Sequence, residues 1–533
     1  MSVADLAARF SKEFASDLPS KRSLTSTTAL LAYLGIADFV VHMAFAGNYG
    51  YFRDELYYIV SGTQHLSLGY VDFPPLTAWV AALLYPLTGD SLVSIHVVSA
   101  LLEAILVFVA GTIARELGGG RRAQLLAAAA TLLTLTFLAD ASELSPDALD
   151  QLWWSVLAYV VVRTVRRRQP KLWVVAGLVI GIGLLSKLTM FFFAGALLLS
   201  FLLVPSGRTY IRSKWVLVGG LLAAFLILPE LYWNAVNGWP TVHFYLSFGG
   251  DVGAGPLGFA FAQLEEPNPL NVPILLLGLW FYLRSDGARG LRALGLAYVI
   301  LFVFMTALGM KPYYLAPIYP MLYAGGAVAA EQSLTSRRSL ARVIGSRPWV
   351  VATLIIAALL APLIMPILQP AALIGAYGAS TVSATNGGVA SGETGPLPQE
   401  LGDRLGWPQM VSSVAQVYES LPTTEKGQAC IFTSNYGEAS ALIFLGKGMG
   451  LPPVISGHNN FWVWGPGSCT GQVLITVGVP YSTLKQAYAT VTNATTITCE
   501  YCMDLENDVP VLVGTGPTFT SLSAEWASVR QYD

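Results

Sequence analysis

The chain has 533 residues, of which 54% are hydrophobic and only 12% are charged, and its formal net charge is -2. That is about half the charged fraction of a typical soluble domain, and apolar runs long enough to cross a bilayer recur along the sequence. An ordinary soluble enzyme is therefore excluded. The near-zero net charge gives no sign of a basic surface, so we expect no nucleic-acid partner.

Residues 1–26 form a polar N-terminal tail that we expect to be cytoplasmic and followed by an uncleaved first span. Residues 27–369 are predicted to form a transmembrane domain with about eleven helices. The expected spans are 27–46, 91–113, 123–139, 148–163, 172–186, 189–204, 215–231, 271–283, 293–309, 313–330 and 349–369.

Basic residues fix the expected orientation. With the N-terminus inside, the predicted cytoplasmic segments hold 22 of the 30 Lys and Arg residues, and the outer segments of the membrane part hold only Arg53, Lys187 and Lys311. This bias follows the positive-inside rule. We therefore place the protein in the cell (inner) membrane as a multi-pass protein.

The first outer loop, 47–90, has an unusual concentration of polar groups. Its first part, 47–75, has the sequence GNYGYFRDELYYIVSGTQHLSLGYVDFPP and contributes Arg53, Asp54, Glu55, Tyr57, Tyr58, Asp72, Pro74 and Pro75. Polar groups beside a bilayer are costly and commonly functional. The alternative is an interfacial loop in which the tyrosines join the aromatic belt and Arg53 pairs with its acidic neighbours.

Other ionisable and aromatic side chains fall at the same outer ends of the predicted spans. They are Glu143, Asp147, Lys187, Glu230, Lys311, Tyr313 and Tyr314. Singly, a lysine at a helix end usually extends to the interface, and a glutamate near a proline usually caps or pairs. Together they indicate a site between helix ends at the membrane surface. The aromatic and Gly-rich segment 232–270 is expected to lie along the interface, either covering that site or serving as a structural re-entrant segment.

The last quarter of the chain differs in composition. Residues 370–400 are rich in Gly, Ala, Ser and Thr and predict a flexible linker, and 401–533 predict an extracytoplasmic α/β domain. Its expected strands are 429–433, 454–456, 473–477, 495–499 and 509–513, and its expected helices are 408–420, 438–445 and 482–490.

All four cysteines lie in this region. Disulfides are expected outside the cell, with Cys499 and Cys502 bonded either to one another or to Cys469 and Cys430. A zinc site is the less favoured alternative, because there is no second close pair of cysteines.

The polar residues at the outer ends of the spans indicate the transfer of a group from a lipid carrier. An outer site has no access to cytoplasmic nucleotide sugars, so a transferred group must arrive activated on a carrier that crosses the membrane, such as a lipid phosphate. Cations and tyrosine hydroxyls suit that anion, and Arg53, Lys187, Lys311, Tyr313 and Tyr314 are the candidates. Asp54 is the candidate general base for an acceptor hydroxyl, with Glu55 orienting the acceptor or raising the basicity of Asp54 by like-charge repulsion.

Several ordered motifs carry a family resemblance. YFRDELYY, VDFPPL, SPDALDQLWW, GIGLLSKLT and KPYYLAPIYPMLYAGGAVAAE together resemble the bacterial branch of glycosyltransferase family 39 over about 45–330. This is the group of GT-C membrane enzymes that includes dolichyl-phosphate-mannose protein mannosyltransferases and lipid A aminoarabinose transferases. SNYGEASALIFLG, LPPVISGHNNFWVWGP and CEYCMDLEND are similar to the C-terminal region of bacterial members.

The resemblance implies a polyprenyl-phosphate sugar donor and inversion at the anomeric carbon. It implies that Asp54 is the catalytic base within an acidic pair with Glu55, and that Lys187 and Lys311 lie on the phosphate side. Substrate-lining residues are then expected at Tyr57, Tyr58, Asp72, Pro74, Pro75, Asp147, Glu230, His458 and Asn459. The acceptor, whether glycan, lipid or protein, is left open, and no cofactor is expected.

Three alternatives compete with this prediction. The first is a lipid-linked sugar transporter or flippase without covalent chemistry, although its ionisable groups would be expected at mid-span with a visible repeat. The second makes the C-terminal domain a glycan-binding module that uses Tyr436, His458, Asn459, Asn460, Trp462 and Trp464, or equally a packed aromatic core. The third is a divalent cation at Asp54 and Glu55.

Overall fold

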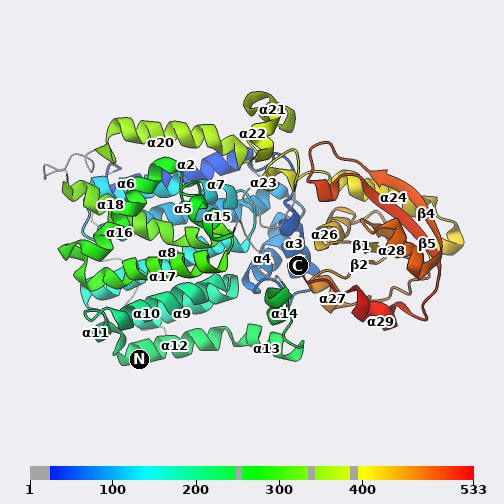
Figure 1. Ribbon diagram of the computed structural model, residues 1–533, viewed down its shortest axis with the longest axis horizontal. Coiled ribbons are helices and arrows are strands. Elements are labelled where there is room, and N and C mark those ends of the chain that lie inside the picture. The colour runs from blue at the N-terminus through cyan, green and yellow to red at the C-terminus, as the bar shows by residue number, and fades with distance from the viewer. Residues whose placement is uncertain (1–23, 248–254, 334–342, 385–393, 533) are drawn as a thin grey trace.

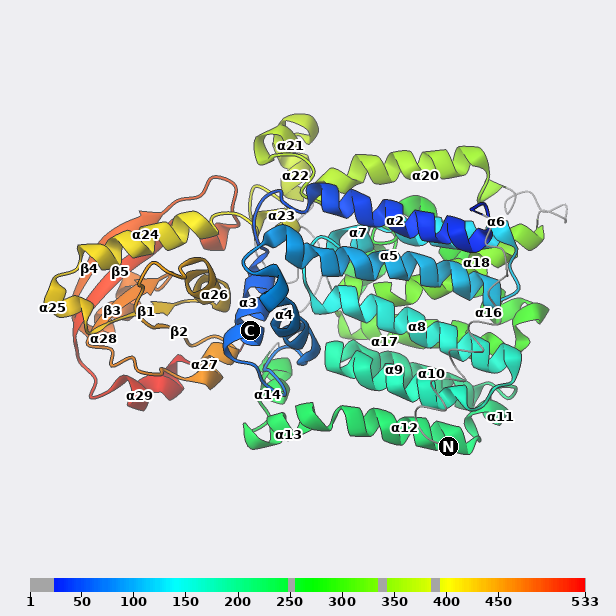
Figure 2. The ribbon, with the colours of Figure 1, turned by 180° about the vertical axis from the view of Figure 1, so that it is seen from behind.

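The computed structural model describes residues 24–247, 255–333, 343–384 and 394–532. A bundle of long helices occupies one end of the molecule and a β-sheet with its own helices occupies the other (Figures 1 and 2). Helices α3 (Arg53–Gln64) and α4 (Leu76–Thr88) lie between these two parts. The expected first outer loop is therefore largely helical.

The bundle consists of helices that run roughly along one direction, joined by short segments (Figure 1). The long helices are α2 (Thr27–Phe45), α5 (Leu92–Glu116), α6 (Arg121–Leu132), α8 (Pro146–Arg167), α9 (Leu172–Ser186), α10 (Thr189–Leu203), α12 (Lys214–Leu226), α16 (Val272–Arg284), α17 (Arg292–Leu308), α18 (Tyr319–Ser333) and α20 (Arg347–Leu360). The short ones are α7 (Leu135–Asp140), α11 (Arg208–Ile211), α13 (Leu228–Val236), α14 (Pro240–Ser247), α15 (Gly255–Ala262), η1 (Pro269–Asn271), η2 (Asp286–Leu291), η3 (Pro312–Ile318) and η4 (Ala361–Leu363).

Helix length does not by itself support the expected eleven spans. Among the described residues, three helices are long and apolar enough to cross a membrane alone: Thr27–Phe45, Leu92–Glu116 and Asp286–Leu308. The bent pair α12 and α13 could form a fourth span. Helices such as α9 and α10 have 15 residues each, which is shorter than the ~20 residues that a full span needs. The molecule is a polytopic helical membrane protein, and the count of eleven stays a prediction.

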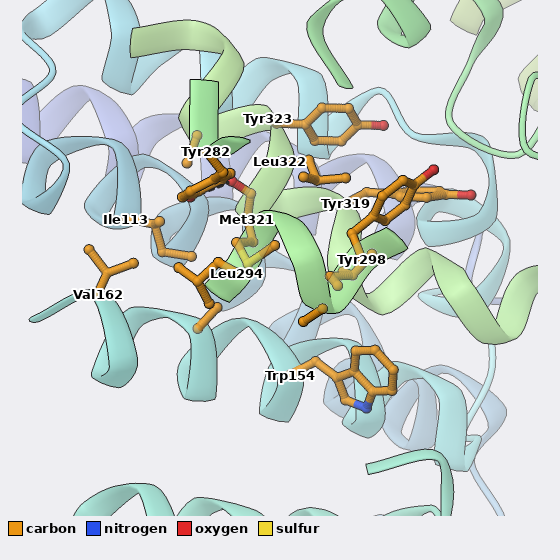
Figure 3. Packing of buried hydrophobic residues seen from close by; sticks show 14 of the residues in the cluster. Ile113, Trp154, Val162, Tyr282, Leu294, Tyr298, Tyr319, Met321, Leu322 and Tyr323 are labelled. Carbon is orange, nitrogen blue, oxygen red and sulfur yellow. Dashed lines mark hydrogen bonds between the residues drawn. The ribbon is translucent and has the colours of Figure 1, made fainter. Parts of the chain in front are cut away.

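Small residues allow the helices of the bundle to approach closely. A Cβ atom on Gly278 of α16 would lie 1.9 Å from the carbonyl oxygen of Leu322, and one on Gly177 of α9 would lie 2.0 Å from that of Gly219. Such contacts suit packing in lipid, where close approach replaces the hydrophobic drive. Large side chains fill the remaining core, with Trp154 and the tyrosines of α16 and α18 among them (Figure 3).

The C-terminal part contains a five-stranded sheet with the strand order β2-β1-β3-β5-β4. Its strands are β1 (Ala429–Thr433), β2 (Val454–Ser456), β3 (Val473–Val477), β4 (Tyr488–Ile497) and β5 (Val509–Pro517). The β1–β2 and β1–β3 pairs are parallel, and the β3–β5 and β4–β5 pairs are antiparallel. The helices here are α23 (Gln399–Gly402), α24 (Trp407–Ser420), α25 (Thr423–Lys426), α26 (Tyr436–Leu445), α27 (Asn460–Trp464), α28 (Tyr481–Ala487), η6 (Asp504–Glu506), α29 (Leu522–Glu525) and η7 (Trp526–Val529).

The cysteines pair within this part. Cys430 is bonded to Cys469, and Cys499 to Cys502, so all four are in disulfides. Of the pairings left open by the sequence, the close pair therefore bonds to itself.

The expected flexible linker begins with helical structure. Residues Pro370–Tyr377 form α21 and Ala379–Ala384 form α22, whereas 385–393 lie outside the described residues. Leu373 and Val382 are fully buried in a small cluster with Leu397 and Leu401. Composition alone predicted flexibility, because it does not show that two apolar side chains of the segment find partners.

The C-terminal part packs directly on the first outer loop. One hydrophobic cluster combines Tyr57 and Phe73 of the loop region with Trp407 of α24 and Ile431 and Ile475 of the sheet. A shared core of this kind fixes the position of α26 on α3, and it places residues of the C-terminal part beside the acidic residues of the loop.

Candidate functional site

The acidic residues of the first loop open helix α3. Phe52 caps the helix without a side-chain hydrogen bond, and Arg53, Asp54 and Glu55 occupy its first turn. Carboxylates are favoured there because the positive end of the helix dipole faces them. Successive helix positions point in different directions, so the three side chains meet different surroundings.

Asp54 is the most accessible of the three charged groups. Its side chain is 33% exposed, and its Oδ1 atom accepts a hydrogen bond of 2.6 Å from the hydroxyl of Tyr436. The Nε atom of Arg53 lies 3.6 Å from the same oxygen. Asp54 therefore presents a carboxylate to the outside of the helix, as a base for an external hydroxyl must.

Glu55 points into the protein instead. Its side chain is fully buried, with Oε2 3.2 Å from Nε2 of His96 and Oε1 accepting from the backbone N–H of Leu144 at 3.0 Å. Burial would raise the pKa of Glu55, but His96 and this N–H outweigh it, and the pKa lies below its ordinary value. Glu55 thus joins α3 to α5, and its predicted role in orienting an acceptor beside Asp54 stays a prediction.

The surroundings of Arg53 also differ from those predicted. Its guanidinium lies 3.4 Å from Asp403 and 3.8 Å from Glu506, both in the C-terminal part, and its side chain is only 11% exposed. Three carboxylates, including Asp54, already face this cation. Arg53 is therefore placed to dock the C-terminal part, and its predicted role as a phosphate-binding group is not favoured.

Asp72 forms a polar junction between the loop and the C-terminal part. Its Oδ1 atom accepts from the hydroxyl of Tyr57 at 3.0 Å and from the amide of Asn460 at 3.1 Å, and Oδ2 accepts from the amide of Asn459 at 3.2 Å. Burial raises the pKa of Asp72 to about 7, opposed by the Tyr57 hydroxyl and the nearby His458. The predicted lining residues Tyr57, Asp72, His458 and Asn459 are thus brought together, as a junction between the two parts.

A second cluster surrounds Lys187, at the C-terminal end of α9. Its ammonium group contacts the carboxylate of Asp147 and lies 4.9 Å and 4.6 Å from the ring centres of Tyr313 and Tyr314. The structure therefore brings together these four predicted residues. Lys311 is half-buried and stands two residues before Tyr313, immediately before η3.

Tyr58 connects the two groups of residues. It is 9% exposed, and burial raises its pKa well above the usual range, with further contributions from the charges of Asp54, Asp72 and Asp147. Charges act on this hydroxyl from both clusters only if both lie near it. The charges of Asp54 and of Asp147, which contacts Lys187, thus both influence Tyr58.

The remaining predicted residues lie at the edge of this region. Glu230 is buried, accepts from the amide of Asn234 at 2.8 Å, and packs so closely on Gly69 that a Cβ there would lie 2.4 Å from its Oε2 atom. Pro74 and Pro75 are buried where α4 begins. All three contribute to packing around the loop.

The sequence did not indicate the link from the C-terminal part to Asp54. The sequence indicates for Tyr436 only a glycan-binding surface or a packed aromatic core. It gives no sign of the role of Arg404, which is fully buried and binds Glu143 at 3.0 Å and the carbonyl oxygen of Ser142 at 3.1 Å. Their partners lie more than 250 residues away in the chain, and no local pattern announces such a pairing. The one local feature in the sequence was that Tyr436 stands directly after Asn435, which caps helix α26.

The paired-carboxylate cation site considered from the sequence is not formed by Asp54 and Glu55, whose side chains have different partners. Within the described residues there is also no group of three or more His, Cys, Asp or Glu side chains arranged to hold a metal ion. The expectation that no cofactor is needed stays a prediction.

A groove of about 720 Å³ lies elsewhere, between α24 and strands β4 and β5, at the end of the C-terminal part far from the bundle (Figures 1 and 2). Hydroxyl and amide side chains such as Ser413, Gln416 and Thr492 line it. It does not include any predicted site residue.

Comparisons with known proteins find similarity to glycosyltransferases in part of the chain. Residues 72–233 match the family described as dolichyl-phosphate-mannose-protein mannosyltransferase; this segment includes Asp72, Asp147, Lys187 and Glu230 but not Asp54. The lipid A galacturonosyltransferase RgtD of Rhizobium johnstonii is 27% identical over 221 residues, which are 41% of this chain and 46% of that protein. The chain thus aligns with less than half the length of this curated relative.

The fold is shared with solved structures. The crystal structure of ArnT from Cupriavidus metallidurans bound to undecaprenyl phosphate superimposes with a TM-score of 0.59 at 15% identity, covering 92% of this chain and 99% of that one. The apo form of the same protein gives a TM-score of 0.59, covering 92% and 98%. The likeness extends over both the helical bundle and the C-terminal part.

Proposed function

From its similarity to bacterial family 39 glycosyltransferases of the GT-C type, we propose that this chain transfers a sugar from a polyprenyl-phosphate carrier to an acceptor at the extracytoplasmic face of the inner membrane. Two observations carry the proposal: Asp54 presents an accessible carboxylate at the start of α3, and Lys187 forms a cluster with Asp147, Tyr313 and Tyr314. The similar ArnT structure was solved with bound undecaprenyl phosphate, which supports this class of carrier.

The donor phosphate would lie at the Lys187 cluster. A lysine ammonium has three N–H donors, and Asp147 uses one of them while fixing the side chain. The remaining donors and the hydroxyls of Tyr313 and Tyr314 would face the phosphate oxygens, with Lys311 approaching from the turn before η3. Charge-assisted hydrogen bonds of this kind are the strong ones for a phosphate.

Transfer would then proceed by direct displacement. The oxygen of the acceptor hydroxyl attacks the anomeric carbon, the bond from that carbon to the phosphate oxygen breaks, and the polyprenyl phosphate leaves with the electron pair. The proton of the hydroxyl passes to Asp54. Attack from the side opposite the phosphate inverts the anomeric configuration. The acceptor class, whether glycan, lipid or protein, is open in this proposal.

The test uses the full-length protein in proteoliposomes with a panel of polyprenyl-phosphate hexoses and pentoses and an envelope extract as acceptor. Release of polyprenyl phosphate, followed by mass spectrometry, identifies transfer. Asp54→Asn should retain donor binding and lose turnover by about 10² to 10⁴. Translocation of the donor without its consumption would instead support a flippase, and undiminished turnover in Asp54→Asn would remove Asp54 as the base.

A further inference from the structure

The hydrogen bond from Tyr436 to Asp54 joins residues 382 positions apart in the chain. Tyr436 is the first residue of α26, in the C-terminal part, and Asp54 is in the first turn of α3. Hydrogen bonds to Asp54 within the described chain reach Oδ1 only, so Oδ2 is left for an external group. This is the arrangement that a base needs if one oxygen is to be held and the other is to act.

The backbone of Tyr436 is fixed by local structure. Asn435 caps α26 through a capping box with Glu438, in which each side chain bonds the other's backbone N–H. The backbone N–H of Tyr436 itself donates to Nδ1 of His458 at 3.3 Å. The start of the helix therefore has little freedom to move relative to the sheet.

The ring of Tyr436 is held on several sides. It stacks on Tyr57 with a centroid distance of 4.5 Å and an interplanar angle of 24°, and lies 4.8 Å from the ring of His458. The guanidinium of Arg53 lies 5.9 Å from its centre. Tyr57 and Arg53 belong to α3 and His458 to the C-terminal part, so the ring is clamped between them.

The hydroxyl stays a donor under these conditions. Burial, reinforced by the negative charge of Asp54, raises the pKa of Tyr436 well above its usual range. A neutral hydroxyl beside a carboxylate donates its hydrogen bond and does not compete for the proton that the carboxylate is to accept.

We propose that Tyr436 is a positioning residue for the base: it fixes the Asp54 carboxylate so that Oδ2 faces the acceptor hydroxyl, and the C-terminal part thereby completes the catalytic site. This inference rests on the proposed function, in which Asp54 takes the proton. A carboxylate on a one-third exposed side chain samples several rotamers, and small misplacements of a reacting group are costly, with a loss of up to about 10²-fold for ~1 Å.

The experiment compares three single variants of the full-length protein. Tyr436→Phe removes one oxygen and keeps the ring contacts, Asp54→Asn removes the base, and Tyr85→Phe is the matched control. The hydroxyl of Tyr85 also bonds across the interface, accepting from Lys447 at 2.8 Å, but belongs to α4 and does not contact Asp54. Turnover, donor KM and apparent melting temperature are measured for each.

Tyr436→Phe should lower kcat by about 10- to 100-fold while donor KM and the melting temperature stay close to those of the unmodified protein, and Tyr85→Phe should leave all three unchanged. The residual turnover of Asp54→Asn is followed overnight. Adding Tyr436→Phe to this variant should not lower the turnover further, because there is no longer a base for Tyr436 to position.

Tyr436→Phe with normal kcat would overturn the inference, as would an equal loss in the Asp54→Asn background. The two proposals fail separately. Full activity of Asp54→Asn would refute the base, whereas an inactive Asp54→Asn with a fully active Tyr436→Phe would refute only the positioning role.

Discussion

The carboxylate of Glu55 is bound by His96, 3.2 Å away, and not shared with its neighbour Asp54. Nδ1 of His96 lies 2.9 Å from the carbonyl oxygen of Ala46, which can only accept, so Nδ1 carries a hydrogen. The contact between Glu55 and His96 ties α3 to α5.

Glu55→Ala is expected to destabilise the protein by about 3–5 kcal/mol, because it removes one partner of a buried pair. A lower apparent melting temperature in detergent would show it, with Glu419→Ala, which breaks an exposed pair with Lys426, as the control without effect. A Glu55→Ala protein that melts normally but has no turnover would return Glu55 to the catalytic site.

The lowered pKa of Glu55 predicts that the stability of the protein depends on pH. The pKa of Glu55 is lowered on folding from its ordinary 4.5. The contribution of Glu55 to the stability of the folded protein is therefore fully present above pH 4.5, and it is lost as the pH falls through the pKa of the folded state. The unmodified protein should therefore lose stability below pH 4.5 more steeply than Glu55→Gln. Parallel curves of melting temperature against pH would contradict this.

Arg53→Gln should loosen the C-terminal part without weakening donor binding. Asp403 is fully buried and Glu506 nearly so, and removal of the Arg53 charge takes away a cation that offsets the cost of burying these two carboxylates. Faster hydrogen exchange in α26 and a lower melting temperature are expected, with donor KM unchanged. Arg289→Gln, whose pair with Asp286 is largely exposed, is the matched control. A raised donor KM with normal stability would favour the phosphate-binding role.

Local patterns predicted local structure well. The apolar runs at 429–433 and 473–477 are the central strands β1 and β3, and the amphipathic run at 408–420 is α24. The expected helix 482–490 ends at Ala487, because Tyr488 turns inward and its strand pairs with β5. Here the demand for a partner strand overrides the helical pattern.

Long-range pairing was only partly predictable. Alternation of the spans correctly placed Asp147, Lys187 and Tyr313 together, because topology sets which loops share a face. It could not show which of two adjacent acids is buried, since that depends on His96, nor that Asp403, Glu506 and Tyr436 would surround Arg53 and Asp54. Those contacts arise from the docking of two parts, which no periodicity encodes.

Asp72 is expected to stabilise the folded protein more as the pH falls. A carboxyl whose pKa is raised on folding, here from 3.8 to about 7, binds its proton more readily in the folded chain, so folding is favoured as the pH falls from 7 toward 4. The difference in melting temperature between the unmodified protein and Asp72→Asn should change across this window. An equal difference at pH 8 and pH 5 would show that Asp72 does not titrate there.

Lys187→Met should weaken donor binding more than it slows the chemical step. Hydrogen bonds to a charged group contribute about 1.5–3 kcal/mol, which corresponds to a rise in donor KM of about 10- to 100-fold. Methionine keeps much of the length of the side chain, so Tyr313 and Tyr314 retain a neighbour. Lys214→Met is the control, because Lys214 also lies over an aromatic ring, that of Trp215, but at the start of α12 near the opposite end of the bundle. Initial rates over a range of donor concentrations separate KM from kcat. An unchanged KM in Lys187→Met, or an equal rise in Lys214→Met, would show that the phosphate is held elsewhere.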